Sequence, residues 1–237
     1  MIAFRGVSKV FTIPHLRRRT VFRRLFAAGR FSYETFPALK GISFEVGAGE
    51  FVGVLGRNGS GKSTLLRIAA GIYQPTTGTV CVDGPVAPVL ELGAGFNAGL
   101  PVRDNVLLYG VLLGIPRRRL LGELPEILDR AGVTRFADAR LESLSTGLRM
   151  RLAFTVALRA DAPVSLIDEA LSVGDEDFQR RSLAELEALR SRGRTALLVS
   201  HSTELLRRLC GRILVLQAGE VLGDGPPDAM IDLYHSQ

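Results

Sequence analysis

The chain has 237 residues, of which 46% are hydrophobic and 23% charged, and its formal net charge is +6. This composition suits a globular protein with a full core and excludes a chain dominated by disordered or low-complexity sequence. The two cysteines, Cys81 and Cys210, lie far apart in the sequence and indicate neither a disulfide framework nor a metal pair, so we expect the reducing cytosol. We expect no signal peptide and no membrane span, since no run approaches the roughly 18 apolar residues that cross a bilayer.

The N-terminal part of the chain combines a strand with an unusual basic segment. Residues 1–11 are predicted to form a strand and turn that end at Phe11. In segment 15–37, apolar side chains share one helical face and arginines lie largely on the other. These residues are Leu16, Phe22, Leu25 and Phe26, and Arg17, Arg18, Arg19, Arg23, Arg24 and Arg30. The pattern predicts a basic amphipathic helix at a membrane surface or in a partner groove; the alternative is a solvated helix packed on its own domain.

From residue 38 onward, apolar periodicity and turn residues predict alternating strands and helices. The predicted strands are 38–46, 51–55, 79–82, 86–91, 163–168, 195–200 and 212–217, with a hairpin at 220–223. The predicted helices are 62–70, 103–114, 117–132, 148–161, 175–192, 202–210 and 226–235, and 93–101 is a glycine-rich loop. Alternation of this kind indicates an α/β fold with a mainly parallel sheet.

We expect a single domain over 1–237 with three parts. An α/β core comprises about 1–92 and 163–225, a helical subdomain is inserted at about 93–162, and a C-terminal helix occupies 226–237.

The motif GRNGSGKST at 56–64 has the spacing G-x-x-x-x-G-K-[ST] and stands between a predicted strand and a predicted helix. Its glycines allow backbone amides to approach an anion, and the following helix directs its positive dipole end to the same place. Lys62 adds a charge for the outer phosphates, and the Ser63 hydroxyl is a ligand for Mg²⁺. The candidate nucleotide-binding residues are Gly56, Arg57, Asn58, Gly59, Ser60, Gly61, Lys62, Ser63 and Thr64. The motif predicts a protein that binds a nucleoside triphosphate.

Polar residues end two later strands. Asp168 and Glu169 end the apolar run 163–168, where Asp168 is placed to hold Mg²⁺ and Glu169 to orient or deprotonate the attacking water. His201 follows the next strand and would face the ligand crevice of an open α/β sheet. Ser145 starts a predicted helix; alone it is an ordinary N-cap, but its hydroxyl and the helix amides also form an anion site.

The ordered motifs GRNGSGKST, STGLRMRLAF, SLIDEALSVGD and LLVSH resemble those of ATP-binding cassette (ABC) ATPases over essentially the whole chain. The resemblance implies an α/β phosphate-loop core with an antiparallel β subdomain and an inserted helical subdomain. It implies that Phe11 stacks on adenine, that Ser145, Thr146 and Gly147 contact the γ-phosphate held by the other subunit, and that Asp175 belongs to the loop linking the subunits. His201 matches the switch histidine. ATP, Mg²⁺ and an ATP-dependent homodimer with two sandwiched ATP molecules follow from the same resemblance.

A narrower resemblance concerns VLELGAGFNAGLPVRDNV, the variant STG, DEALSVGDEDFQ and the basic insertion after Phe11. Together they are similar to the ATPase subunits that export O-antigen, capsule or teichoic acid in bacteria. This implies a peripheral protein on the cytoplasmic face of the inner membrane, bound two plus two to a permease, with 15–37 at the membrane surface.

The sequence departs from the family pattern in three ways. Leu148 replaces the signature glutamine, and the glutamine between core and helical subdomain is absent, with Glu91 or Asn97 as the nearest polar candidates. We also expect no C-terminal sugar-binding domain of the kind that some such exporters carry, and we therefore expect substrate selection in the membrane partner.

Other functions of the same cassette chemistry stay open at this point. An exporter of lipids or small molecules differs only in its membrane partner. A soluble ATPase acting on nucleic acid or ribosomes would suit the basic charge, but the single cassette without a long coiled coil argues against it, so we expect no nucleic acid partner. An importer fits the export-type loops less well.

Overall fold

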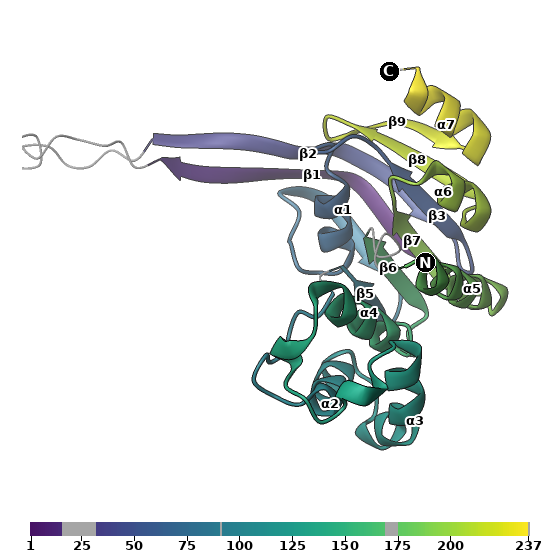
Figure 1. Cartoon of the computed structure of the whole chain (residues 1–237). Coiled ribbons are helices and arrows are strands. Elements are labelled where there is room, and N and C mark those ends of the chain that lie inside the picture. Colours follow the sequence, from purple (N-terminus) through teal and green to yellow (C-terminus); the bar gives the residue numbers. More distant parts are fainter. Residues whose placement is uncertain (16–31, 91, 169–174, 237) are drawn as a thin grey trace, which may run out of the picture.

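The computed structural model describes residues 1–15, 32–90, 92–168 and 175–236 (Figure 1). It contains two β-sheets and a lobe of helices that lies below them in the view of Figure 1. We call α2 (Val102–Leu112), α3 (Arg117–Arg130) and α4 (Thr146–Ala157), with the two short 3-10 helices between α3 and α4, the helical lobe. The predicted fold class, an α/β phosphate-loop core with a mainly parallel sheet, an antiparallel sheet and inserted helices, is confirmed.

The larger sheet has six strands, and its central strands are buried on both faces. In spatial order they are β5 (Val86–Val89), β6 (Val164–Asp168), β7 (Thr195–Val199), β3 (Phe51–Leu55), β8 (Arg212–Gln217) and β9 (Glu220–Gly225). The first five are parallel, and β9 returns antiparallel to β8. Continuous apolar runs such as the buried FVGVL of β3 are typical of parallel strands covered on both faces.

The smaller, antiparallel sheet has the order β2 (Ser32–Val46), β1 (Ile2–His15), β4 (Thr77–Val82). The far ends of β1 and β2 project from the body as a two-stranded ribbon (Figure 1). The predicted helix over 15–37 is therefore wrong at His15 and at 32–37, while 16–31 lie outside the described residues. The strand also does not end at Phe11, which pairs with Phe36. Thr12, Ile13 and their cross-strand partners favour extended backbone, since β-branched and aromatic side chains stabilise strand pairs.

The helices agree with the predicted ones to within a few residues. They are α1 (Lys62–Ala69), α2 (Val102–Leu112), α3 (Arg117–Arg130), α4 (Thr146–Ala157), α5 (Glu176–Ser191), α6 (Thr203–Leu209) and α7 (Pro227–His235). The 3-10 helices η2 (Thr134–Phe136) and η3 (Leu141–Ser143) were not predicted. In the helical lobe, α2 approaches α3 closely because Gly110 has no side chain: a Cβ atom there would lie 2.5 Å from Leu120.

Two apolar clusters form the core. One lies under the smaller sheet and includes Phe4, Leu39 and α1 residues such as Leu66. The other runs from the larger sheet into the helical lobe, where Phe154 and Leu152 are buried. Among the described residues, none of the helices has the combination of length and apolar sequence that crossing a membrane requires.

Arg212 joins the two sheets through charged hydrogen bonds. Its Nε donates to Glu50 Oε1 at 2.8 Å, one terminal nitrogen donates to Asp224 Oδ2 at 2.6 Å, and the other donates to the Glu45 carbonyl at 2.5 Å. The Arg212 side chain is only 25% exposed. The hydrogen bond from Arg212 and that from the Gly47 amide hold the pKa of Glu50 below its ordinary value, against the effect of burial.

We predict that Arg212→Gln lowers the free energy of unfolding by about 2 kcal/mol, because it leaves two half-buried carboxylates without their cation. Urea denaturation at neutral pH measures the loss. Since the pKa of folded Glu50 is lowered, its share of the stability is complete above the ordinary glutamate value and disappears as pH falls through the folded pKa, so the difference from wild type shrinks in acid.

Arg5→Gln is the matched control. Arg5 forms a 3.6 Å ion pair with Glu45, and both side chains are more than half exposed, so its loss costs no more than about 0.5 kcal/mol. Equal losses from the two variants would contradict the role of Arg212.

Candidate functional site

The predicted site residues gather at the carboxyl edge of three neighbouring parallel strands. Val54 of β3 and Asp168 of β6 both pair with Val199 of β7, so the loops after these strands leave the sheet at the same level. The phosphate loop follows β3, and His201 follows β7. In an open α/β sheet this edge is where ligands bind.

The phosphate loop fits into its surroundings only because of its glycines. A Cβ atom on Gly56 would lie 2.4 Å from the Leu216 carbonyl oxygen, and one on Gly61 would lie 2.7 Å from the Ala38 carbonyl oxygen. Gly59 and Gly61 also have φ values of 81° and 109°, which other residues rarely adopt. The loop is therefore held against β8 and β2 in one shape.

Inside this loop several hydrogen-bond donors converge, and some of them have no acceptor among the described residues. Lys62 is 6% exposed, and its Nζ donates to the carbonyls of Gly56 at 2.7 Å and Arg57 at 3.0 Å. The Ser60 hydroxyl is buried and has no hydrogen-bond partner among the described residues. The amides of Gly59, Gly61 and Ser63 form no hydrogen bond to another described residue. Donors that converge at a helix N-terminus beside a buried cation fit a phosphate chain.

Two side chains near this loop could supply oxygen ligands to a metal ion. Ser63 lies in the first turn of α1, and Asp168 ends β6, which packs beside α1. Among the residues that the structure describes, no group of three or more His, Cys, Asp or Glu side chains is placed to hold a metal. A hydroxyl and one carboxylate fit Mg²⁺ that arrives with a nucleotide, because this ion keeps several waters and phosphate oxygens as ligands.

Some predicted residues are not placed, and others have local structural roles. Glu169 and Glu91 lie outside the described residues. Asn97 accepts the Gly99 amide at 3.0 Å through its side chain, and its backbone exchanges hydrogen bonds with the Asn105 side chain at 2.7 and 2.9 Å. Asn97 is therefore engaged in shaping the loop before α2, which weakens it as a substitute for the missing glutamine.

His201 is exposed at the wall of a cavity of about 580 Å³ between α5 and α6. The neighbouring Ser200 hydroxyl accepts the Ser202 amide at 3.0 Å, and Ser202 caps α6. This turn fixes the backbone at His201 at the same sheet edge as Asp168. Glu176, Gln179, Leu183, Leu205 and Arg208 are among the other residues lining the cavity.

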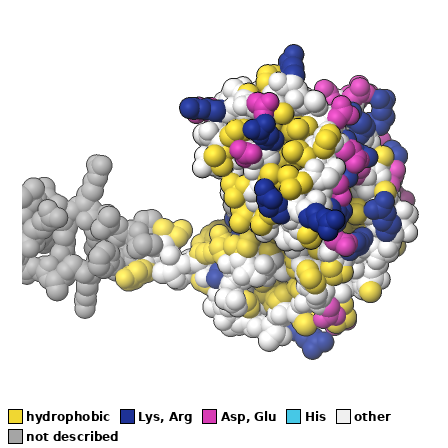
Figure 2. Space-filling model, turned by 90° about the horizontal axis from the view of Figure 1, so that it is seen from below, with side chains coloured by type: hydrophobic (Ala, Val, Ile, Leu, Met, Phe, Trp, Pro, Cys, Tyr) yellow, Lys and Arg dark blue, Asp and Glu magenta, His cyan; other side chains and the backbone are white. Residues whose placement is uncertain are grey.

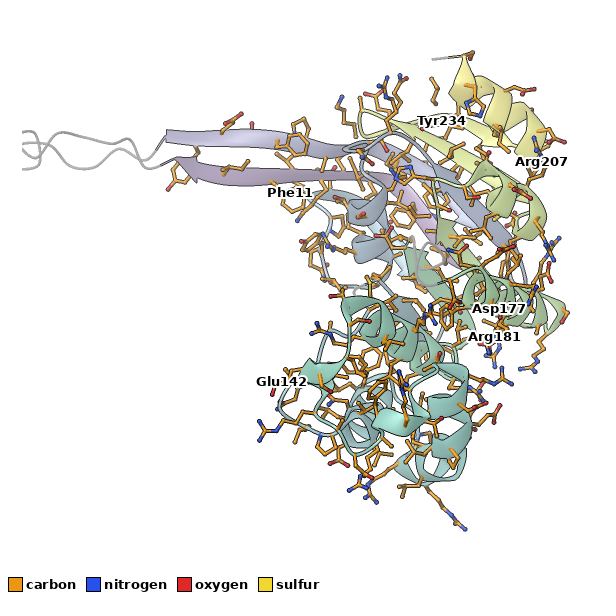
Figure 3. The ribbon with its side chains drawn as sticks, in the orientation of Figure 1. Phe11, Glu142, Asp177, Arg181, Arg207 and Tyr234 are labelled. Atoms are coloured by element: carbon orange, nitrogen blue, oxygen red, sulfur yellow. The ribbon has the colours of Figure 1, made fainter. Side chains whose placement is uncertain are left out.

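Phe11 lies on β1 where the ribbon passes α1 (Figure 3). Its ring meets Tyr73 edge to face, with 5.4 Å between ring centroids. The Nζ of Lys9 is 5.1 Å from the centroid of Phe11 and is held by the Gln74 carbonyl at 2.8 Å. The half-buried ring is thus fixed in orientation, as a stacking platform requires.

Ser145, Thr146 and Gly147 lie at the start of α4 in the helical lobe and are exposed. The Ser145 hydroxyl accepts the Leu148 amide at 3.3 Å, which confirms the predicted N-cap. Within the described part of the chain, no hydrogen bond joins these three residues to the phosphate loop. The start of α4 is open to another molecule.

Asp175 caps α5 and contacts a residue that the sequence reasoning did not single out. One of its oxygens accepts the Phe178 amide at 2.9 Å, and the other is 2.9 Å from Arg151 of α4. The amide and the guanidinium together hold the pKa of Asp175 below its ordinary value. Arg151 stands in STGLRMRLAF, but its partner is 24 positions away, and only the fold brings them together.

A glycine-rich loop between a buried central strand and a helix, with an acid ending a nearby parallel strand, defines a phosphate-loop nucleotide-binding protein. The protein-family model described as "ABC transporter" matches residues 39–172. A protein of Aeromonas salmonicida, "ABC transporter protein AbcA", is 40% identical over 235 residues, covering 99% of this chain and 76% of that protein. The "O-antigen export system ATP-binding protein RfbB" of Myxococcus xanthus is 39% identical over 197 residues, covering 83% of this chain but 45% of its own length.

Among solved structures, the "dimeric structure of a post-hydrolysis state of the ATP-binding cassette MJ0796 bound to ADP and Pi" is similar with a TM-score of 0.74 and 26% identity. The match covers 96% of this chain and 99% of that one. The chain therefore belongs to the ABC transporter family and is an ABC-type ATPase.

We predict that Phe11→Ala weakens ATP binding by about tenfold or more, because one stacked base contributes roughly 1–3 kcal/mol. Equilibrium titration with ATP measures this. Inorganic triphosphate, which has no base, is the control ligand, and its affinity should not change. A variant that loses affinity for both ligands equally, or for neither, would contradict the stacking role.

Proposed function

We propose that this chain is the ATP-hydrolysing subunit of a bacterial exporter that moves a polysaccharide or lipid-linked glycan, of the O-antigen, capsule or teichoic acid kind, across the cytoplasmic membrane. The assembled phosphate-loop edge carries the ATPase part of the proposal. The similarity to an O-antigen export protein over 83% of the chain supports the export part. That relative is more than twice as long as the matched region, so its substrate is carried over only as a proposal.

In this proposal each part of the site acts on one part of the nucleotide. The amides of the phosphate loop and Lys62 bind the phosphates, and the base stacks on Phe11. Ser63 and Asp168 would hold Mg²⁺, which neutralises charge on the transferred phosphoryl group. Glu169 orients the attacking water and accepts its proton, while His201 contacts the γ-phosphate. Positioning and charge neutralisation supply most of the rate, as is usual for phosphoryl transfer.

A second copy of the chain completes the site. The exposed start of α4, with Ser145, Thr146 and Gly147, would reach the γ-phosphate bound by the partner's phosphate loop, and Asp175 would lie at the contact between the copies. The backbone amides and the helix dipole at the start of α4 would favour ATP over ADP, because ATP carries more negative charge. The dimeric form of MJ0796 supports this arrangement.

The membrane partner would meet an apolar surface on the helical lobe. Leu108, Val111 and Leu112 of α2 are 37%, 49% and 63% exposed, although the opposite side of the same helix is buried. In Figure 2, which views the molecule from the side of the helical lobe, apolar side chains lie in patches between charged ones. Exposed apolar side chains on consecutive turns indicate a binding surface.

The ribbon of β1 and β2 would add a second contact, at the membrane surface. Ile13, Tyr33 and Phe36 are 45%, 63% and 50% exposed on it. The intervening sequence, within segment 15–37, contains the cluster of arginines, a composition that favours anionic headgroups. The protein would thus be peripheral, on the cytoplasmic face of the inner membrane in a two-plus-two complex.

The test is to purify tagged protein from detergent-solubilised membranes and identify its partners and the accumulated glycan. We predict that a polytopic membrane protein co-purifies, and that Glu169→Gln keeps ATP binding, nearly abolishes ATP hydrolysis and causes lipid-linked glycan to accumulate in cells.

Leu112→Asp should weaken recovery of the membrane protein, because it places a charge in the apolar surface.

Leu222→Asp is the matched control, since Leu222 is also an exposed leucine, at 45%, but lies on β9. Recovery of ribosomes or nucleic acid without a membrane protein would contradict the export function. A Glu169→Gln variant that hydrolyses ATP at most of the wild-type rate would overturn the catalytic role.

A further inference from the structure

Among the described residues, two arginine–carboxylate pairs join the helical lobe to α5. Arg151 of α4 pairs with Asp175 at the start of α5, and Arg130 of α3 pairs with Glu185 further along the same helix. These pairs connect segments far apart in the sequence, so they help to fix the position of the helical lobe relative to α5. Only the first of them lies next to predicted site residues.

Arg151 is held on two sides. Its side chain is 18% exposed, with one terminal nitrogen 2.9 Å from Asp175 Oδ2. The centre of its guanidinium is 5.3 Å from the centroid of the Phe178 ring, and Phe178 packs edge to face on Phe154 at 6.1 Å. A guanidinium that stacks on a ring while pairing with a carboxylate has little freedom, and lysine cannot reproduce both contacts.

Asp175 uses its two oxygens for different purposes. Oδ1 accepts the Phe178 amide and so fixes where α5 begins, and Oδ2 receives Arg151. Asp175 comes six residues after Glu169, and Arg151 comes six residues after Ser145 on α4. The ion pair therefore joins the start of α5 to α4, the helix whose first residues carry the proposed γ-phosphate contacts.

We propose that Arg151 is a positioning residue that sets the start of α4 relative to the start of α5, so that both are in register when the second copy of the chain binds. This inference rests on the site roles proposed above for Ser145 and Glu169. The phosphate loop belongs to a different part of the core, so loss of Arg151 slows turnover and leaves ATP affinity unchanged. Small displacements of reacting groups are costly for rate, by up to about a hundredfold per ångström.

The experiment is a double-mutant cycle on the intact chain, with kcat and ATP affinity measured for each variant. Arg151→Gln should lower kcat by about tenfold or more and leave the dissociation constant for ATP within about twofold. Asp175→Asn keeps an oxygen for the Phe178 amide but loses the ionic partner, and should slow kcat similarly. The double variant should be no slower than either single variant, because both remove one interaction. Arg151→Lys, which keeps the charge, should recover part of kcat.

Arg130→Gln is the control, because it removes the other tie to α5 without touching the start of α4. It should leave kcat unchanged. Full activity of Arg151→Gln, losses that multiply in the double variant, or an equal loss from Arg130→Gln would overturn the proposal. If Glu169→Gln also keeps its turnover, the site roles themselves fail; if only Arg151→Gln does, the site stands and the positioning role fails.

Discussion

The close packing of the phosphate loop against β2 and β8 is the constraint on which the rest of the structure depends. Because Gly56 and Gly61 leave no room for a Cβ atom, the loop is pressed between neighbouring strands and cannot relax into another turn. In this shape the Ser60 hydroxyl and several loop amides have no hydrogen-bond partner in the described part of the chain, and Lys62 is held among them. The unfavourable burial of these groups is offset when a phosphate chain accepts their hydrogen bonds.

In the proposed function, one chain offers only part of the catalytic site. The sheet edge provides the phosphate loop, Asp168 and His201, whereas the start of α4 belongs to the helical lobe and is exposed. A second copy would supply the missing contact, and the Arg151–Asp175 pair would then couple the position of the lobe to the start of α5. In the proposed function, binding of ATP, closure of two chains and movement of a membrane partner docked on α2 would be connected through α5.

Local patterns predicted much of this architecture. Apolar runs bounded by glycine and polar residues predicted the parallel strands, and the motif spacing predicted the phosphate loop, Asp168 and His201 at one sheet edge. The ribbon was missed because an arginine-rich segment with spaced apolar residues fits a helical period, while pairing of β1 with β2 decides the structure of its ends. Arg151 was missed because its role depends on a contact that no local pattern encodes. Glu169 remains a prediction from sequence.

The most direct test of the account is the mass of the Glu169→Gln variant in solution, measured by light scattering with saturating ATP and Mg²⁺. Because this variant should bind ATP without consuming it, the account predicts a dimer with ATP, a monomer without nucleotide, and a monomer again when Ser145→Arg is added to block the start of α4. A single-chain mass at saturating ATP, or a dimer that neither ATP nor Ser145→Arg affects, would contradict the claim that two chains complete the site.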